Sequence, residues 1–409
     1  MEKYAIIEGG VCSAKGFRAA GVAAGIKYKD RKGVALIVAD RPCTAAAMFT
    51  TNTLAAAPVV LDREIAKFGK AQAILANSGY ANACTGPEGL RDAVESVKAT
   101  AAELHIDPRQ VFVASTGVIG RRLPMKRLLS GMREAVKNLA ATPQAGLDAE
   151  HAVMATDTKP KQAAVKVKIL GHEVTIGGMC KGSGMIEPNM ATMLGFITTD
   201  CVIAPGMLRN ALRSAVNRGF NRLIVDGDES TNDSVFILAS GAAGNKEIRH
   251  PDASFRAFRD ALIQLVAALA RQMAADGEGA TALMEVHVRN AADVKSAKIL
   301  AKSVVGSLLT KAAVYGHDAN WGRILCALGY AGVDFDPENV DLYLASGAEC
   351  AHIFSHGSAC DYSEEKATAI LSQPEVIITA DMHQGGAEAT AWGCDLTHEY
   401  VNINADYRS

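Results

Sequence analysis

Short apolar runs rich in β-branched residues alternate along this chain with amphipathic segments of helical period, and this alternation most constrains the fold. Strands are expected at 34–40, 73–77, 111–116, 166–170, 222–228, 284–288, 340–345, 376–382 and 400–407. Helices are expected at 89–104, 127–140, 205–220, 252–277 and 291–316. The strands are too many for a helix bundle, so the pattern predicts the α/β or α+β class.

The clearest break in the chain is the turn DGEGATA at residues 276–282, which separates the longest helical pattern from a new strand. Asp252 is a candidate N-cap of that helix, and Gly277 lies near its end. A chain of 409 residues is long enough for about two domains. We therefore expect a second domain to begin after this turn.

Charge and composition favour a small molecule or another protein as the partner. The chain has 42 Lys and Arg against 44 Asp and Glu, so its net charge of −2 predicts no nucleic acid and no membrane surface as partner. The N-terminal segment lacks the apolar core of a signal peptide, and no apolar run approaches the ~18 residues of a spanning helix. Nine cysteines without a CxxC pair indicate reduced thiols and a cytoplasmic protein.

The Gly-rich and acidic segments lack the spacing of the common phosphate and metal motifs. KGSG at 181–184 does not continue as a Walker A loop, and GSGMIE ends in Glu187 where a dinucleotide fingerprint has glycine. DGDESTND at 226–233 begins like a Ca²⁺ loop but carries Thr231 and Ile237 in place of the required Gly and Glu. We interpret it as a polar strand-to-helix turn, and the sequence predicts no metal and no organic cofactor.

Residues 181–194, KGSGMIEPNMATML, combine turn-forming residues with methionines and contain one threonine, Thr192. A Thr hydroxyl is a poor nucleophile without a base. If the chain cuts itself before Thr192, the new α-amino group, of pKa ~7.7–8.0, is such a base. Ala191 is small enough for attack on its carbonyl, Gly184 and Pro188 would bend the loop, and the methionines would exclude water. Thr192 is thus a candidate N-terminal nucleophile, beside the alternative of an ordinary core threonine.

The segment 181–194 resembles the signature of the ornithine acetyltransferase family, also called the glutamate N-acetyltransferase family. The resemblance extends in the family's order over almost the whole chain. Its further blocks are NSGYANACTG (77–86), ASTGVIG (114–120), TDTKPK (156–161), VDGDESTNDS (225–234), DGEGAT (276–281), ANWGRI (319–324) and YVNINADYRS (400–409).

The resemblance implies a layered sandwich of sheets and helices, with a catalytic domain at 1–281, a smaller α/β domain at 282–390 and a C-terminal strand within 391–409 that returns to the active site. It implies cleavage between Ala191 and Thr192 into an α chain, 1–191, and a β chain, 192–409, which assemble as α2β2. Thr192 would take the acetyl group of N-acetylornithine as an ester and give it to glutamate, in a ping-pong reaction without metal or organic cofactor.

The resemblance also assigns roles to individual residues. Thr116 and Gly117 match the oxyanion hole, which supplies a hydroxyl and a backbone N–H to the developing negative charge. Substrate contacts are implied for Thr158, Lys181, Thr192, Glu278, Asn404 and Ser409. Lys181 is suited to a substrate carboxylate, and Glu278 to the ammonium of ornithine or to a proton. Departures from the family pattern occur at Tyr80, Glu229 and Ala282.

Three questions stay open on the sequence. A self-processing aminopeptidase or amidase of related architecture would share the N-terminal nucleophile but pass the acyl group to water. A binding protein with a structural Thr192 is a further alternative. Family members also differ in whether acetyl-CoA serves as a second acetyl donor, and no residue of this chain decides that point.

Overall fold

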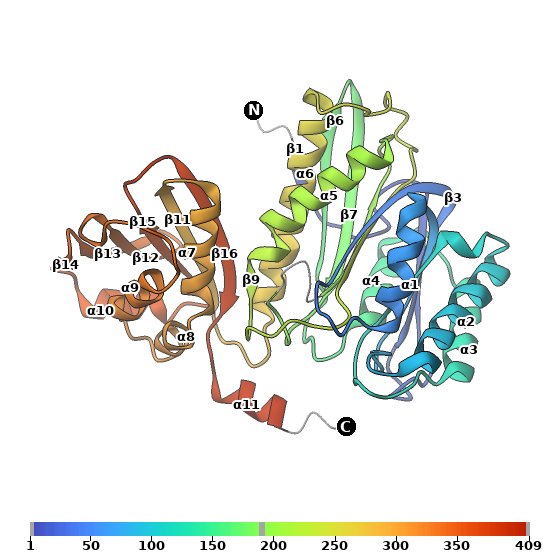
Figure 1. Cartoon of the computed structure of the whole chain (residues 1–409), viewed down its shortest axis with the longest axis horizontal. Coiled ribbons are helices and arrows are strands. Elements are labelled where there is room, and N and C mark those ends of the chain that lie inside the picture. The colour runs from blue at the N-terminus through green and yellow to red at the C-terminus, as the bar shows by residue number, and fades with distance from the viewer. Residues whose placement is uncertain (1–3, 188–192, 406–409) are drawn as a thin grey trace. The chain divides into compact units, whose positions relative to one another are not determined.

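A computed structural model describes residues 4–187 and 193–405, which form two compact units (Figure 1). Within the described residues, unit 1 consists of 4–182, 193–221 and 229–269. Unit 2 consists of 183–187, 222–228 and 270–405, so it begins before the domain boundary expected after residue 281. The two short segments join unit 2 from far away in the sequence.

The described residues of unit 1 form a nine-stranded sheet in the order β1-β6-β7-β8-β10-β3-β4-β5, with β2 paired to β3. The strands are β1 (Tyr4–Ile7), β2 (Phe17–Val22), β3 (Val34–Phe49), β4 (Lys70–Asn77), β5 (Val111–Ser115), β6 (Gln162–Ile169), β7 (His172–Lys181), β8 (Leu194–Thr199) and β10 (Ser234–Ala239). β3 is long enough to pair with β2 and β4 through its first half and with β10 through its second. A register shift between Val38 and Cys43 separates the two halves.

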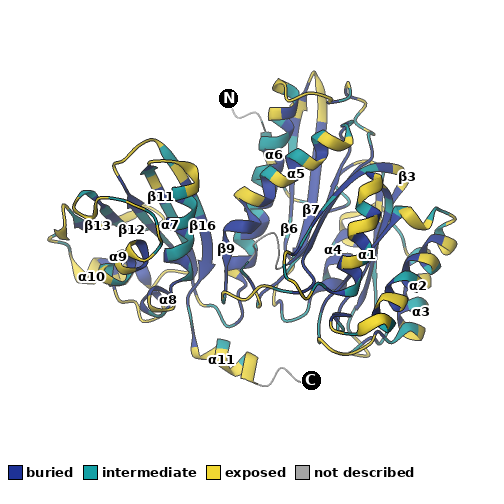
Figure 2. Ribbon diagram, viewed as in Figure 1, coloured by how far each residue is buried: buried dark blue, intermediate teal, exposed yellow. Residues whose placement is uncertain are grey.

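Helices pack against this sheet and bury its apolar side chains. They are α1 (Ala57–Ile65), α2 (Gly86–Leu104), α3 (Met125–Lys137), α4 (Pro143–Val153), α5 (Pro205–Arg218) and α6 (Ala253–Ala275), with short 3₁₀ turns η1 (Ala66–Phe68), η2 (Pro108–Gln110) and η3 (Phe220–Arg222). The last residue of η3 and residues 270–275 of α6 belong to unit 2. In the core, the ring of Phe236 lies 5.0 Å from that of Phe112 and 6.0 Å from that of Phe196. The strands are largely buried, and the exposed residues lie in the loops and on the outward faces of the helices (Figure 2).

Unit 2 contains a seven-stranded sheet in the order β14-β13-β12-β15-β11-β16-β9, as far as its residues are described. The strands are β9 (Leu223–Ile224), β11 (Leu283–Ala291), β12 (Asp341–Ser346), β13 (Glu349–Ser355), β14 (Ser358–Ala359), β15 (Glu375–Asp381) and β16 (Ala387–Cys394). Its helices are α7 (Val294–Gly306), α8 (Leu308–Tyr315), α9 (Trp321–Gly329), α10 (Glu364–Leu371) and α11 (His398–Ala405), with η4 (Pro337–Asn339). Among the described residues, no helix is long and apolar enough to cross a membrane.

The predicted α/β class is confirmed, and three local predictions are wrong. Of the strand expected at 400–407, residues 400–405 belong instead to α11, which Thr397 caps by accepting the N–H of Tyr400, and residues 406 and 407 lie outside the described residues. The helix expected at 291–316 is broken into α7 and α8, since Ser307 caps the second helix. The acidic segment 226–233 leads into strand β10 and not into a helix.

Candidate active site

The predicted oxyanion residues Thr116 and Gly117 lie on the loop after β5, which contacts the loop after β4 at one edge of the sheet in unit 1. β4 and β5 are parallel neighbours with Asn77 opposite Ser115, so the loops that follow them start side by side. The N–H of Thr116 donates to the carbonyl of Asn77 at 3.0 Å, and the N–H of Val118 donates to that of Gly79 at 3.1 Å. The loop 116–118 is therefore held against the loop after β4 by main-chain hydrogen bonds.

Position 117 accepts only glycine without strain. Gly117 has φ of +126°, which L side chains rarely adopt, and an added Cβ would lie 2.3 Å from the carbonyl carbon of Gly79 and 2.7 Å from the nitrogen of Tyr80. Within residues 4–187 and 193–405, the N–H of Gly117 donates to no protein group. The loop thus presents a main-chain donor whose neighbouring peptides are already fixed.

Lys181, the last residue of β7, binds the hydroxyl of Thr116. Its Nζ donates to Thr116 Oγ1 at 3.1 Å, and Thr116 is largely buried. An ammonium group has no acceptor, so the Thr116 oxygen must accept this bond and its own hydrogen stays available for donation. Next to Gly117, this arrangement provides the hydroxyl and N–H pair that an acyl oxyanion requires.

Asp157 binds the backbone directly after the end of β7. Its Oδ1 accepts from the N–H of Gly182 and from Lys161 Nζ, both at 2.7 Å, and the Asp157–Lys161 pair is almost fully buried. Burial alone would raise the pKa of Asp157, but the charges of Lys181 and Lys161 outweigh it and lower the pKa to about 2. A carboxylate that stays ionised thus holds the backbone next to Lys181.

Glu278 and Asn404 lie together in unit 2. Asn404 Nδ2 donates to Glu278 Oε2 at 2.7 Å, and the N–H of Glu278 donates to the carbonyl of Ser183 at 2.8 Å. A Cβ on Gly184 would lie 2.1 Å from Glu278 Oε2, so this glycine makes room for the carboxylate. The Glu278 carboxylate is mostly buried and is suited to binding an ammonium group.

Asp226 holds the segment 183–187, which precedes the predicted cleavage junction. Its carboxylate accepts from the N–H of Met185 at 2.6 Å and from that of Ile186 at 2.8 Å. Glu187 forms an ion pair with Lys302 of α7 at 3.2 Å, which gives this acidic residue a partner inside an otherwise apolar segment. Sequence reasoning missed Asp226 and Lys302, although Asp226 lies in the block 225–234.

The predicted site residues fall into three groups. Thr116, Gly117 and Lys181 meet in unit 1, where Thr158 is exposed and directly follows Asp157. Glu278 and Asn404 meet in unit 2. Ala191, Thr192 and Ser409 lie outside the described residues.

The departures from the family pattern are accommodated locally. Tyr80 is half-buried and its carbonyl accepts from Asn77 Nδ2 at 3.0 Å. Ala282 is buried, and its N–H donates to Asp395 Oδ1 at 3.1 Å. Glu229 is exposed, and its carbonyl accepts from Asn52.

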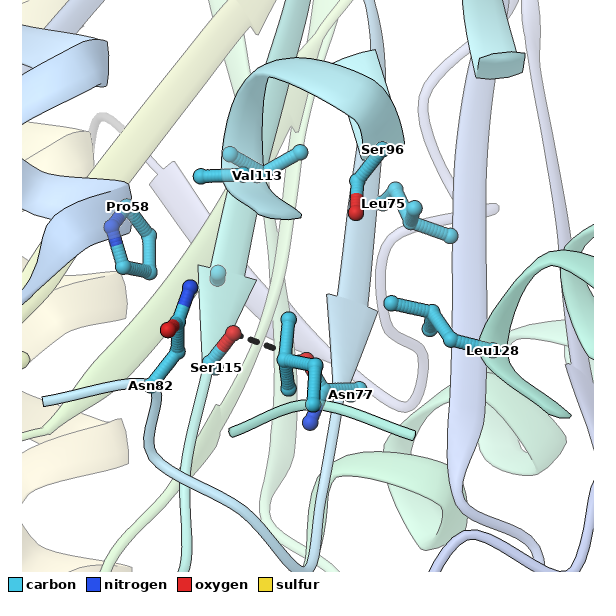
Figure 3. A pocket seen from close by; sticks show the side chains of 11 residues that line it. Pro58, Leu75, Asn77, Asn82, Ser96, Val113, Ser115 and Leu128 are labelled. Carbon is cyan, nitrogen blue, oxygen red and sulfur yellow. Dashed lines mark hydrogen bonds between the residues drawn. The ribbon is translucent and has the colours of Figure 1, made fainter. Parts of the chain in front are cut away.

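A small cavity beneath the oxyanion loops is lined by Asn77, Asn82, Ser96 and Ser115 together with apolar side chains (Figure 3). Its volume of about 10 Å³ is close to the least that one water molecule needs, so it holds no substrate. In the part of the chain that the structure describes, no group of three or more His, Cys, Asp or Glu could hold a metal ion.

The fold is of the α/β class, and the Thr116 hydroxyl and the Gly117 N–H are two adjacent donors of the kind that enzymes of acyl transfer use. The ArgJ family model matches residues 18–409. The arginine biosynthesis bifunctional protein ArgJ of Symbiobacterium thermophilum is 52% identical over 405 residues, 98% of this chain and 99% of that protein. The protein of the same name from Thermotoga neapolitana is 48% identical over 399 residues, 97% of this chain and 99% of its own length. The chain therefore belongs to the ArgJ family, and it is an acetyltransferase of arginine biosynthesis.

A solved structure agrees with this assignment. The crystal structure of arginine biosynthesis bifunctional protein argJ from Bacillus halodurans is 45% identical and has a TM-score of 0.50. The match covers 52% of this chain and 99% of the solved chain.

Proposed function

We propose that this chain transfers the acetyl group of N-acetyl-L-ornithine to L-glutamate through an ester on Thr192, after cutting itself between Ala191 and Thr192. The observation that carries the proposal is the Lys181–Thr116 contact beside the Gly117 N–H, which has no acceptor among the described residues, in a chain of the ArgJ family. These donors suit the oxygen of an acetyl carbonyl as it gains negative charge.

In the first half-reaction, the Thr192 oxygen attacks the acetyl carbon while its proton passes to the α-amino group of Thr192. The tetrahedral oxyanion accepts from the Thr116 hydroxyl and the Gly117 N–H. When the C–N bond breaks, the α-nitrogen of ornithine leaves with that proton. In the second half-reaction the amine of glutamate attacks the ester, N-acetylglutamate leaves, and the Thr192 hydroxyl is restored.

The proposed substrate contacts divide by charge. Lys181 and Thr158 would serve a substrate carboxylate, and Glu278 with Asn404 would serve the free ammonium of ornithine. Ser409 completes the set implied by the family. No metal or organic cofactor takes part, because every step uses groups of the chain and of the two substrates.

Pairing in unit 1 supports a product of two chains that stay together. β8 belongs to 192–409 and pairs with β7 of 1–191, and β10 pairs with β3 in the same way. Cleavage at 191/192 would leave these ladders intact. The solved chain from Bacillus halodurans matches over 99% of its own length but covers only 52% of this chain, which is in keeping with a precursor that is cut into two chains. We propose that the two chains form α2β2 in the cytoplasm.

Mass analysis of the purified protein tests the cleavage. We expect fragments 1–191 and 192–409 from the wild type and from Thr192→Ser, which keeps a hydroxyl. Thr192→Ala should stay intact and inactive. A wild type that is uncut and fully active would refute the mechanism.

A glutamate-dependence assay separates the transferase from the amidase alternative. Release of ornithine from N-acetylornithine should require glutamate and yield N-acetylglutamate in equal amount. Release at the same rate without glutamate would mean hydrolysis. The same assay with acetyl-CoA and glutamate decides whether the thioester is a second donor.

A further inference from the structure

Asn232, in the loop between β9 and β10, binds the end of β5 directly before the loop that carries Thr116 and Gly117, and it also binds the neighbouring loop after β4. Its Nδ2 donates to the carbonyl of Ser115 at 2.8 Å and to the carbonyl of Ala81 at 2.6 Å. Its Oδ1 accepts from Thr231 Oγ1 at 2.7 Å. Two carbonyls can only accept, so the NH₂ side of the amide must face them. Asn232 is 8% exposed, and all these groups belong to unit 1.

The peptide between Ser115 and Thr116 is thereby held on both sides. Asn232 Nδ2 donates to the Ser115 carbonyl of this peptide, and the Thr116 N–H of the same peptide donates to the carbonyl of Asn77 at 3.0 Å. This peptide directly precedes the Thr116 hydroxyl and the Gly117 N–H. Its orientation therefore sets the direction in which both donors point.

A second set of hydrogen bonds, which does not involve Asn232, joins the same two loops. Ser115 Oγ donates to Asn77 Oδ1 at 2.7 Å, as the dashed line in Figure 3 marks, and Asn77 Nδ2 donates to the carbonyl of Tyr80 at 3.0 Å. The side chains of Asn77 and Ser115 come from the two strands themselves. Asn232 comes from a segment more than a hundred residues later in the chain, so it ties the loops to a separate part of the sheet.

We propose that Asn232 is a positioning residue of acetyl transfer, which holds the Thr116 hydroxyl and the Gly117 N–H on the acyl oxygen by clamping the Ser115–Thr116 peptide. The inference rests on the function proposed above. In the cleaved enzyme, Asn232 lies on the chain 192–409 while Thr116 and Gly117 lie on the chain 1–191. The oxyanion pair is thus built by one chain and oriented by the other.

The variant Asn232→Asp tests this role because aspartate has the shape of asparagine but places an acceptor oxygen where the NH₂ group donates. A carboxylate would face two carbonyl oxygens, and the Ser115–Thr116 peptide would have to turn or shift. A displacement near 1 Å can lower a rate by about 10². We expect kcat for acetyl transfer to fall about 10- to 100-fold. The KM for N-acetylornithine should stay within about threefold, since ground-state binding does not need these donors.

Asn82→Asp is the matched control. Asn82 is 0% exposed and lies on the loop after β4, but its Nδ2 donates to the carbonyl of Gly89 and its Oδ1 accepts from Thr85. It makes the same kind of buried amide contacts without touching the Ser115–Thr116 peptide. We expect it to lower stability and leave kcat within about twofold.

Inhibition by ornithine provides a readout that a general loss of structure would change. Ornithine has no acyl oxygen, so its inhibition constant should be the same for the wild type and Asn232→Asp. Asn232→Ala removes the two donors without adding charge and should lower kcat about 10-fold. If Asn232→Asp does not fold, Asn232→Ala serves as the test of the positioning role.

The outcomes separate this inference from the proposed function. An unchanged kcat in cleaved Asn232 variants, or equal losses in the Asn232 and Asn82 variants, would overturn the positioning role while the wild type still transfers acetyl. A wild type that makes no N-acetylglutamate would overturn the proposed function and, with it, the role given to Asn232.

Discussion

Replacing Glu150 with glutamine should stabilise unit 1 at neutral and alkaline pH. Glu150 lies on α4, and its side chain is fully buried. Burial raises the pKa of Glu150 to about 8, although Gln162 and Lys161 act in the opposite direction, and the negative charge of Asp157 raises it further. The folded protein therefore keeps a proton on this carboxyl group at a pH where the unfolded chain has released it.

The sign and size of the effect follow from the two pKa values. Between the ordinary value of 4.5 and about 8, the folded state binds more protons than the unfolded state, so the free energy of unfolding falls as pH rises. Each pKa unit corresponds to about 1.4 kcal/mol, so the loss reaches about 4 kcal/mol by about pH 7.5. A glutamine resembles the protonated acid in shape and has no proton to lose.

Urea unfolding of the wild type and Glu150→Gln at about pH 5 and about pH 7.5 measures this difference. We expect nearly equal stabilities at the lower pH and a gain of about 3–4 kcal/mol for the glutamine variant at the higher pH. Glu95→Gln, an exposed change on α2, should shift stability by less than about 0.5 kcal/mol at either pH. A Glu150→Gln effect of the same size at both pH values would refute the reasoning.

Two glycine substitutions give further predictions. Gly117→Ala should cost about 3 kcal/mol or more in thermal or urea unfolding, because its Cβ would overlap the backbone of Gly79 at φ of +126°. Gly86→Ala, also at positive φ but with nothing within 4 Å, should cost about 1 kcal/mol, and equal costs would contradict the steric argument. Gly184→Ala should push the Glu278 carboxylate aside, raising the KM for N-acetylornithine several-fold with little loss of stability, and an unchanged KM would contradict the role of Glu278.

The strands of the central sheets could be predicted because their side chains are buried on both faces. The runs at 73–77 and 111–116 became β4 and β5, in which nearly every residue is buried. The same reasoning was wrong for 400–407, where alternating polar and apolar residues have the period of a strand. There the Thr397 side chain caps a helix by accepting the N–H of Tyr400. No described residue of this helix is buried, so burial does not favour a strand.

The partners within the site could not be predicted from sequence. Lys181 was predicted to hold a substrate carboxylate, and the contact of its ammonium with Thr116, 65 residues away, was not foreseen. Asn232 was part of a polar turn whose residue types fit an ordinary loop. The amide acts through two backbone carbonyls, and any residue has a carbonyl, so no pattern of side chains marks the contact. Such pairs depend on which loops the sheet order brings together.

The composition of the segment 181–194 predicted a special loop but not the contacts that hold it. The bend predicted at Gly184 is present at residues 183–185, and Gly184 also leaves space for the Glu278 carboxylate. Water exclusion was predicted for the methionines: Met193 is buried, Met190 lies outside the described residues, and Met185 is 42% exposed at φ of +57° beside the buried Ile186. Hydrogen bonds from both N–H groups to Asp226 can stabilise this rare conformation. The chain is thus fixed just before residues 188–192 by polar contacts, which suits a junction where one carbonyl must be presented to a neighbouring hydroxyl.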